Sequence, residues 1–67
     1  MGYIELQKDG KSYGAEYHLF DNLLTMHGER GTEQIQLNGM AEHLAAKTVL
    51  RTLIRKGHID PTEGNLA

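Results

Sequence analysis

Alternating apolar and polar residues dominate the first half of the chain, and apolar residues at helical spacing follow in the second half. Alternation places every second side chain on one face of a strand, whereas apolar residues three or four positions apart share one face of a helix. The alternating segments are residues 3–7, 12–20, 23–28 and 32–37, and the helical spacing runs from about 40 to 56. The pattern therefore predicts four strands followed by one helix.

Short turn signals separate the predicted strands. Asp9-Gly10 is a strong signal for a type I′ hairpin, because both central residues of that turn need positive φ. Asp21-Asn22 is a weaker pair of the same kind, and the stretch "GERG" at 28–31 fits a third turn. All three turns align the apolar residues on one inner face, except that Met26 lies opposite Glu33. That predicted face consists of Ile4, Leu6, Tyr13, Ala15, Tyr17, Leu19, Leu24, Met26, Ile35 and Leu37.

A sheet with one apolar face needs a cover, which the predicted helix supplies. Asn38 or Gly39 is the expected N-cap, and Gly57 follows the expected last turn. We therefore predict an α+β fold in which a four-stranded antiparallel meander packs against one C-terminal helix. This domain is expected to span residues 1–57, and residues 58–67 are expected to form a flexible tail. The apolar stripe of the helix consists of Ala46, Val49, Leu50, Leu53 and Ile54.

The composition removes several functional classes. The chain of 67 residues contains no cysteine, so it lacks disulfides, thiolate metal ligands and a cysteine nucleophile. It has no Gly-rich phosphate loop, GxSxG, HExxH or EF-hand motif. We therefore predict no cofactor and no enzymatic activity. No apolar run approaches about 18 residues, and the N-terminal stretch lacks the apolar region of a signal peptide, so we expect no membrane partner and a cytoplasmic location.

Three polar residues share the predicted outer face of the sheet. Glu16 and His27 are directly opposed in the predicted register, and His18 lies diagonal to His27. Two imidazoles and a carboxylate are ligands that zinc accepts, and a His–Glu pair can carry acid–base chemistry. Strand alternation alone also places these residues together. A flat face open to water lacks the enclosure of an active site, so the metal site remains an alternative.

The positive charge of the chain is concentrated on the predicted helix. Residues 1–46 contain three basic residues and seven acids, whereas residues 47–67 contain four basic residues and two acids. Lys47, Arg51 and Arg55 line one side of the helix, and Lys56 lies further round. This stripe is typical of a weak nucleic-acid-binding or phosphate-binding surface, but such charge runs are more often a solvated helix face, which is the favoured interpretation.

A domain of this length buries only about 60% of its unfolded surface, so it needs support from elsewhere. Phe20 and Leu23 face each other across a turn on the outer side of the sheet, and Met40 and Leu44 lie outside the helical stripe. These four residues lack a partner within the predicted monomer. Together with two open strand edges, they predict a homodimer, with exchange of a helix or hairpin between protomers as one route.

The order "KSYGAEYHL", "LLTMHGERGTEQIQLNG" and "HLAAKTVLRTLIRKG" resembles a set of short uncharacterised bacterial proteins over residues 11–57. That resemblance implies a small antiparallel sheet with one helix and a bacterial source, and it carries no catalytic residue. Three functional classes therefore stay open. The first, which is favoured, is a non-catalytic homodimeric interaction or accessory module, and the second is a nucleic-acid or phosphate binder. The third is an enzyme or metal protein that uses Glu16, His18 and His27.

Overall fold

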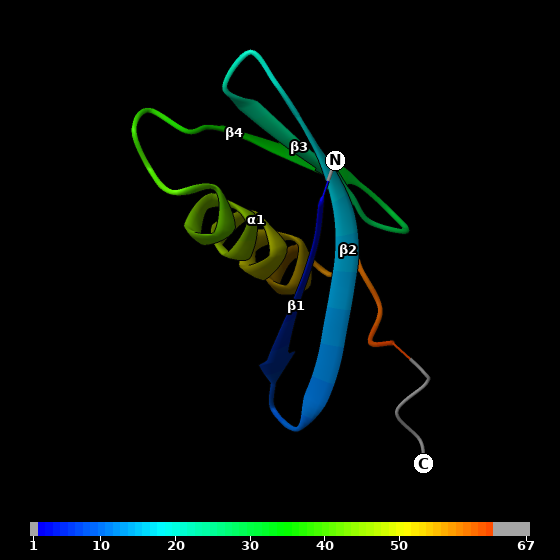
Figure 1. Cartoon of the computed structure of the whole chain (residues 1–67). Helices are drawn as coiled ribbons and strands as arrows, with labels where there is room; N and C mark the ends of the chain where they lie inside the picture. Colours follow the sequence, from blue (N-terminus) through cyan, green and yellow to red (C-terminus); the bar gives the residue numbers. More distant parts are fainter. Residues whose placement is uncertain (1, 63–67) are drawn as a thin grey trace.

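The computed structural model describes residues 2–62, which form one antiparallel sheet with a helix on one of its faces (Figure 1). The strands neighbour one another in chain order, so the predicted α+β meander is confirmed. The elements are β1 (Gly2–Lys8), β2 (Lys11–Phe20), β3 (Leu23–His27), β4 (Thr32–Gln36) and α1 (Glu42–Lys56).

The register of all three strand pairs agrees with the register predicted from the turns. Leu6 pairs with Tyr13, Leu19 with Leu24, and Met26 with Glu33. Asp9 and Gly10 have φ of 55° and 78°, and Asp21 and Asn22 have φ of 57° and 65°. Positive φ at both central residues is the requirement of a type I′ turn, which explains why these short polar pairs set the register.

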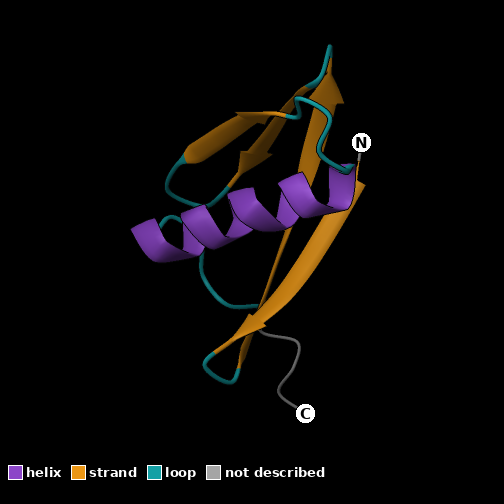
Figure 2. Cartoon of the chain, turned by 90° about the vertical axis from the view of Figure 1, so that its left-hand side faces the viewer, coloured by secondary structure: helices purple, strands orange, loops and turns teal. Residues whose placement is uncertain are grey.

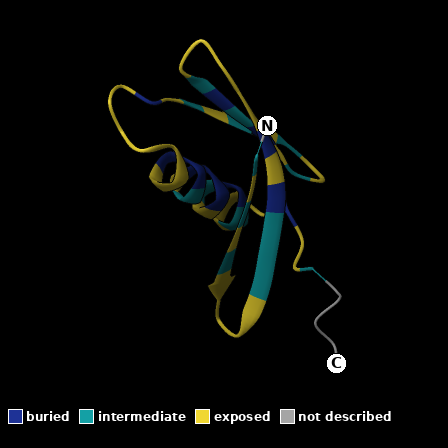
Figure 3. Ribbon diagram, in the orientation of Figure 1, coloured by how far each residue is buried: buried dark blue, intermediate teal, exposed yellow. Residues whose placement is uncertain are grey.

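The hydrophobic core lies between the inner face of the sheet and α1, which crosses that face (Figure 2). Burial is greatest at the centre of this layer (Figure 3). The edge and hairpin residues Ile4, Leu6, Tyr13 and Ile35 are only partly buried. The buried core consists of Ala15, Tyr17, Leu24, Met26, Leu37, Ala45, Ala46, Val49, Leu50, Leu53 and Ile59.

Leu19 departs from the predicted inner face, because 36% of its surface remains exposed. The hydroxyl of Tyr17 donates to Glu42 Oε2 at 2.6 Å, which places Tyr17 beside the first turn of α1. Leu19 lies two residues further along β2, toward the Asp21-Asn22 turn. The helix therefore begins too late to cover it.

The start of the helix differs from the prediction. Asn38 and Gly39 have positive φ of 47° and 88° and form a turn, so neither caps the helix. The N-cap is Ala41, which makes no side-chain capping hydrogen bond, and the Met40 N–H instead donates to Leu37 O at 2.8 Å. The predicted C-cap is confirmed, because Gly57 adopts the left-handed conformation with φ of 74°.

The residues that follow the helix pack against the domain, contrary to the predicted tail. Ile59 is 6% exposed and belongs to the core. The Thr62 N–H donates to Ser12 O at 2.8 Å, so the segment continues along β2. The prediction of a tail from residue 58 is wrong for 58–62, and its remaining part lies outside the described residues.

The β3–β4 turn holds this segment through a set of hydrogen bonds that we call the Arg30 clasp. The Arg30 guanidinium donates to Gly57 O at 2.8 Å and to both carboxylate oxygens of Asp60 at 3.1 and 2.6 Å. The Arg30 N–H donates to His58 O at 2.9 Å, and the Asp60 N–H donates to Glu29 Oε1 at 3.0 Å. The hydrogen bond to Gly57 O also gives a donor to a carbonyl at the C-terminus of α1, where the carbonyl groups of a helix have no partner within the helix.

Candidate functional site

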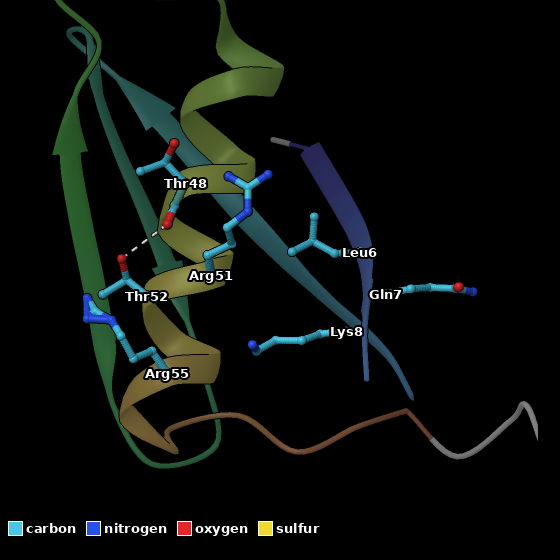
Figure 4. Close-up of a pocket in the computed structure, with 7 residues that line it drawn as sticks. All are labelled: Leu6, Gln7, Lys8, Thr48, Arg51, Thr52 and Arg55. Atoms are coloured by element: carbon cyan, nitrogen blue, oxygen red, sulfur yellow. Dashed lines mark hydrogen bonds between the residues drawn. The ribbon is translucent and has the colours of Figure 1, made fainter. Parts of the chain in front are cut away.

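A groove of about 590 Å³ lies where the end of β1 meets the outward side of α1 (Figure 4). Its volume falls within the range of ordinary ligand sites, which is roughly 300–1,000 Å³. The residues that line it are Leu6, Gln7, Lys8, Thr48, Arg51, Thr52 and Arg55.

Two elements contribute the cations of this groove. Lys8 is the last residue of β1 and shares the inner face of that strand with Leu6. Arg51 and Arg55 lie about one turn apart on α1. Figure 4 shows Lys8 reaching from β1 toward the helix and Arg51 extending over the helix on the side nearer β1. Arg55 extends the cationic lining toward the other side of α1.

The groove is positive because, among residues 2–62, no acid belongs to its lining. Within residues 2–62, neither Arg51 nor Arg55 takes part in an ion pair or a side-chain hydrogen bond. The Lys8 ammonium lies 4.0 Å from the carboxylate of Asp9, and both side chains are largely exposed. An exposed pair at this distance contributes little, so the ammonium stays available to a ligand.

The threonines of the groove offer no free hydroxyl hydrogen. Thr48 donates to Leu44 O at 3.0 Å, and Thr52 donates to Thr48 O at 3.1 Å. The side chain of Gln7 points away from the groove in Figure 4. Cations are therefore the donors that the groove presents, and Leu6 adds an apolar wall.

Only part of the predicted basic stripe contributes to the groove. Arg51 and Arg55 line it, whereas Lys47 is half-buried outside the lining. Lys56 donates to Glu33 Oε2 at 2.7 Å, and this hydrogen bond holds the pKa of the Glu33 carboxyl below its ordinary value. Sequence reasoning missed Lys8, although its place on the inner face two residues after Leu6 was a signal that it points toward the helix.

The outer-face residues lie as predicted, but they do not form a ligand set. The imidazoles of His18 and His27 are 5.7 Å apart between ring centroids, edge to face, and both side chains are exposed. His27 Nδ1 lies 3.2 Å from Thr32 Oγ1. In the described part of the chain, no three His, Asp or Glu side chains are placed to hold a metal ion, and Glu16 is therefore not part of such a group.

The apolar residues predicted for self-association fall into two separate groups. Phe20 and Leu23 pair across the β2–β3 turn, and Phe20 is 82% exposed while Leu23 is half-buried. Met40 and Leu44, at the start of the helix, are 39% and 49% exposed. The two groups belong to different elements, so each is a separate candidate for contact with a partner.

No protein-family model, curated protein or solved structure matches this chain. The resemblance to short bacterial proteins therefore stays a prediction. Among residues 2–62, no helix combines the length and the apolar character needed to cross a membrane.

Proposed function

We propose that this protein is a non-catalytic interaction module that binds an anionic partner in the groove between β1 and α1. One observation carries the proposal, namely that Lys8, Arg51 and Arg55 line a groove to which the described part of the chain contributes no acidic residue. Arg30 and Lys56, by contrast, are engaged in ion pairs with Asp60 and Glu33.

The chemistry of these cations suits carboxylate or phosphate groups. A guanidinium presents a planar fork of donors that matches both anions with two parallel hydrogen bonds, and an ammonium adds a compact charge. The hydroxyls of Thr48 and Thr52 in the groove donate to the helix backbone and face no general base among the residues that line it. Binding without catalysis is therefore the activity that this lining supports.

Charge reversal at Arg51 tests the proposal. We expect fluorescein-labelled oligothymidylate or polyglutamate to bind the protein at low salt and to dissociate as salt is raised, since such contacts are screened. Arg51→Glu should weaken binding at least about tenfold, which corresponds to about 1.4 kcal/mol. The preferred probe indicates whether the natural anion is a nucleic acid or an acidic protein.

The double variant Gln34→Glu, Gln36→Glu is the matched control, because it makes the same change of net charge at two exposed β4 residues outside the groove lining. It should weaken binding much less than Arg51→Glu. Equal losses in the two variants, or no binding of either probe at low salt, would contradict the groove as the site. Circular dichroism of each variant shows that the fold is retained.

Self-association is the second candidate, and the exposure of Phe20 favours it. A phenylalanine that is 82% exposed beside the half-buried Leu23 is the kind of contact that a second copy buries. A homodimer would also support a marginal core of this size. The absence of cysteine fits a reducing compartment, so we place the module in a bacterial cytoplasm.

Sedimentation equilibrium at high micromolar concentration tests the homodimer. The expected mass is that of two chains for the unchanged protein and of one chain for Phe20→Glu. Leu44→Glu, at the second exposed group, shows which of the two surfaces forms the contact. A mass near one chain for the unchanged protein would reject the homodimer.

A further inference from the structure

The outer edge of β1 presents backbone groups that β2 does not use. The two-residue turn after Lys8 makes Lys8 and Lys11 a hydrogen-bonded pair, and such pairs alternate along an antiparallel ladder. Tyr3, Glu5 and Gln7 therefore direct their N–H and C=O groups toward the free edge. β1 contains no proline, so it lacks one of the usual devices that protect an edge strand.

The inner side of this edge is incompletely covered. Ile4 and Leu6 pack against the core but remain only half-buried, so part of their surface is open at this edge. A strand added beside β1 would place every second side chain next to them. Apolar residues at those positions would complete the burial of Ile4 and Leu6.

The groove adds charge to the same edge. It begins at Leu6 and Lys8 on β1 and continues to Arg51 on α1. A side chain that follows the apolar positions of an added strand would lie beside Lys8 and within reach of Arg51. A carboxylate satisfies both cations, whereas a basic residue at that position would be repelled.

We propose that the free edge of β1 binds an extended acidic peptide as an antiparallel fifth strand. The peptide would place apolar side chains against Ile4 and Leu6 and a carboxylate against Lys8 and Arg51. The acidic part of this inference rests on the proposed function of the groove. Backbone hydrogen bonds supply affinity in this mode of recognition, and the alternate side chains supply specificity.

Other occupants of this edge satisfy fewer of its groups. The opposite edge strand, β4, carries Glu33 on its inner face, where it pairs with Lys56, so an acid added opposite Glu33 would be repelled by that carboxylate. Two copies joined antiparallel through β1 in a centred register would oppose two Glu5 carboxylates and leave each Lys8 opposite Gly2, without an acidic partner. A nucleic acid would neutralise the cations but leave the strand edge unpaired.

The acetylated and amidated peptide ETVTVT tests the proposal. Its glutamate is opposite Lys8 and its valines are opposite Leu6 and Ile4 in the proposed register. We expect NMR shifts at β1 and at Arg51, and slower hydrogen exchange at the Tyr3, Glu5 and Gln7 amides. The peptide KTVTVT should bind much more weakly. N-methylation of the three threonines removes the donors that face β1 and should weaken binding at least about tenfold.

Two variants at one position separate strand addition from simple attraction of charge. Glu5→Pro removes an outward N–H that β2 does not use, which an edge strand tolerates, and Glu5→Ala is the matched control that keeps it. Glu5→Pro should no longer bind ETVTVT, whereas Glu5→Ala should still bind it. Both variants should still bind polyglutamate. Equal binding of the N-methylated peptide would overturn strand addition and leave the anion groove intact, even if Glu5→Pro does not fold.

Two further outcomes would also overturn the proposal. Equal binding of ETVTVT to Arg51→Glu and to the unchanged protein would show that the groove does not recognise the glutamate of the peptide. Protection of the Tyr3, Glu5 and Gln7 amides that rises with protein concentration, without peptide, would assign the edge to a second copy.

Discussion

At the scale of single residues, the β3–β4 turn needs glycine at two positions because a neighbouring residue leaves no room for a side chain, and not because the backbone there is left-handed. Neither Gly28 nor Gly31 has a positive φ. A Cβ at Gly28 would collide with the backbone carbonyl of His58, and a Cβ at Gly31 with the His58 imidazole. Sequence reasoning identified them as turn glycines, because the residue that constrains them lies far along the chain.

Gly31→Ala should lower the free energy of unfolding by about 1–3 kcal/mol, the usual cost of added atoms in a packed site. His58 must move or the turn must open, because the new methyl group and the imidazole occupy the same space. Urea denaturation measures the loss. The double variant with His58→Ala should recover part of it, and an unchanged cost in that background would contradict the contact.

The Arg30–Asp60 pair predicts a loss of stability in acid. Its hydrogen bonds hold the pKa of the Asp60 carboxyl below its ordinary value, so the folded state binds the proton more weakly than the unfolded state. The stabilisation is therefore complete above the unfolded pKa of about 3.9 and is lost as pH falls through the lower folded pKa. Asp60→Asn should reduce stability at neutral pH and flatten its decline in acid.

Glu16→Gln is the control for this experiment, because Glu16 is exposed on the outer face and forms no ion pair with the described residues. Thermal unfolding at a series of pH values between neutral and strongly acidic gives the comparison. If stability falls equally toward low pH in Asp60→Asn and in the unchanged protein, the Arg30–Asp60 pair is not the cause of the loss in acid.

At the scale of elements, the strands, their register and the helix end at Gly57 were predictable, whereas the start of the helix and the path of the chain after it were not. Alternation and two-residue turns are local signals, so Asp9-Gly10 and Asp21-Asn22 were sufficient to align three strands. The path after Gly57 depends on contacts of Arg30 with Asp60 and of Thr62 with Ser12, which are 30 and 50 residues apart. No periodicity in the chain reports such contacts.

Ile59→Ala tests whether the segment after α1 is part of the core. We expect a loss of about 2–4 kcal/mol in the free energy of unfolding, because Ile59 is 6% exposed and its truncation leaves a cavity. Leu44→Ala removes a similar side chain that is 49% exposed, and it should cost far less. Equal losses in chemical denaturation would restore the prediction of a loose tail.

At the scale of the whole molecule, the two faces of the domain differ in charge. The helix side presents Lys8, Arg51 and Arg55 in one groove, while the exposed side chains of the outer sheet face include Glu5 and Glu16. The excess of positive charge on the helix was predictable from composition. The groove was not, because Lys8 and Arg51 meet only after β1 and α1 have packed together.

The Arg30 clasp closes a loop of the chain much as a covalent cross-link would. Its side-chain bonds join residues 27 to 31 positions apart and hold the last described segment against the β3–β4 turn. Small secreted domains close such loops with disulfides, which this chain cannot form because it contains no cysteine. One arginine and one aspartate thus act as a reversible staple, whose strength depends on pH and on salt rather than on redox conditions.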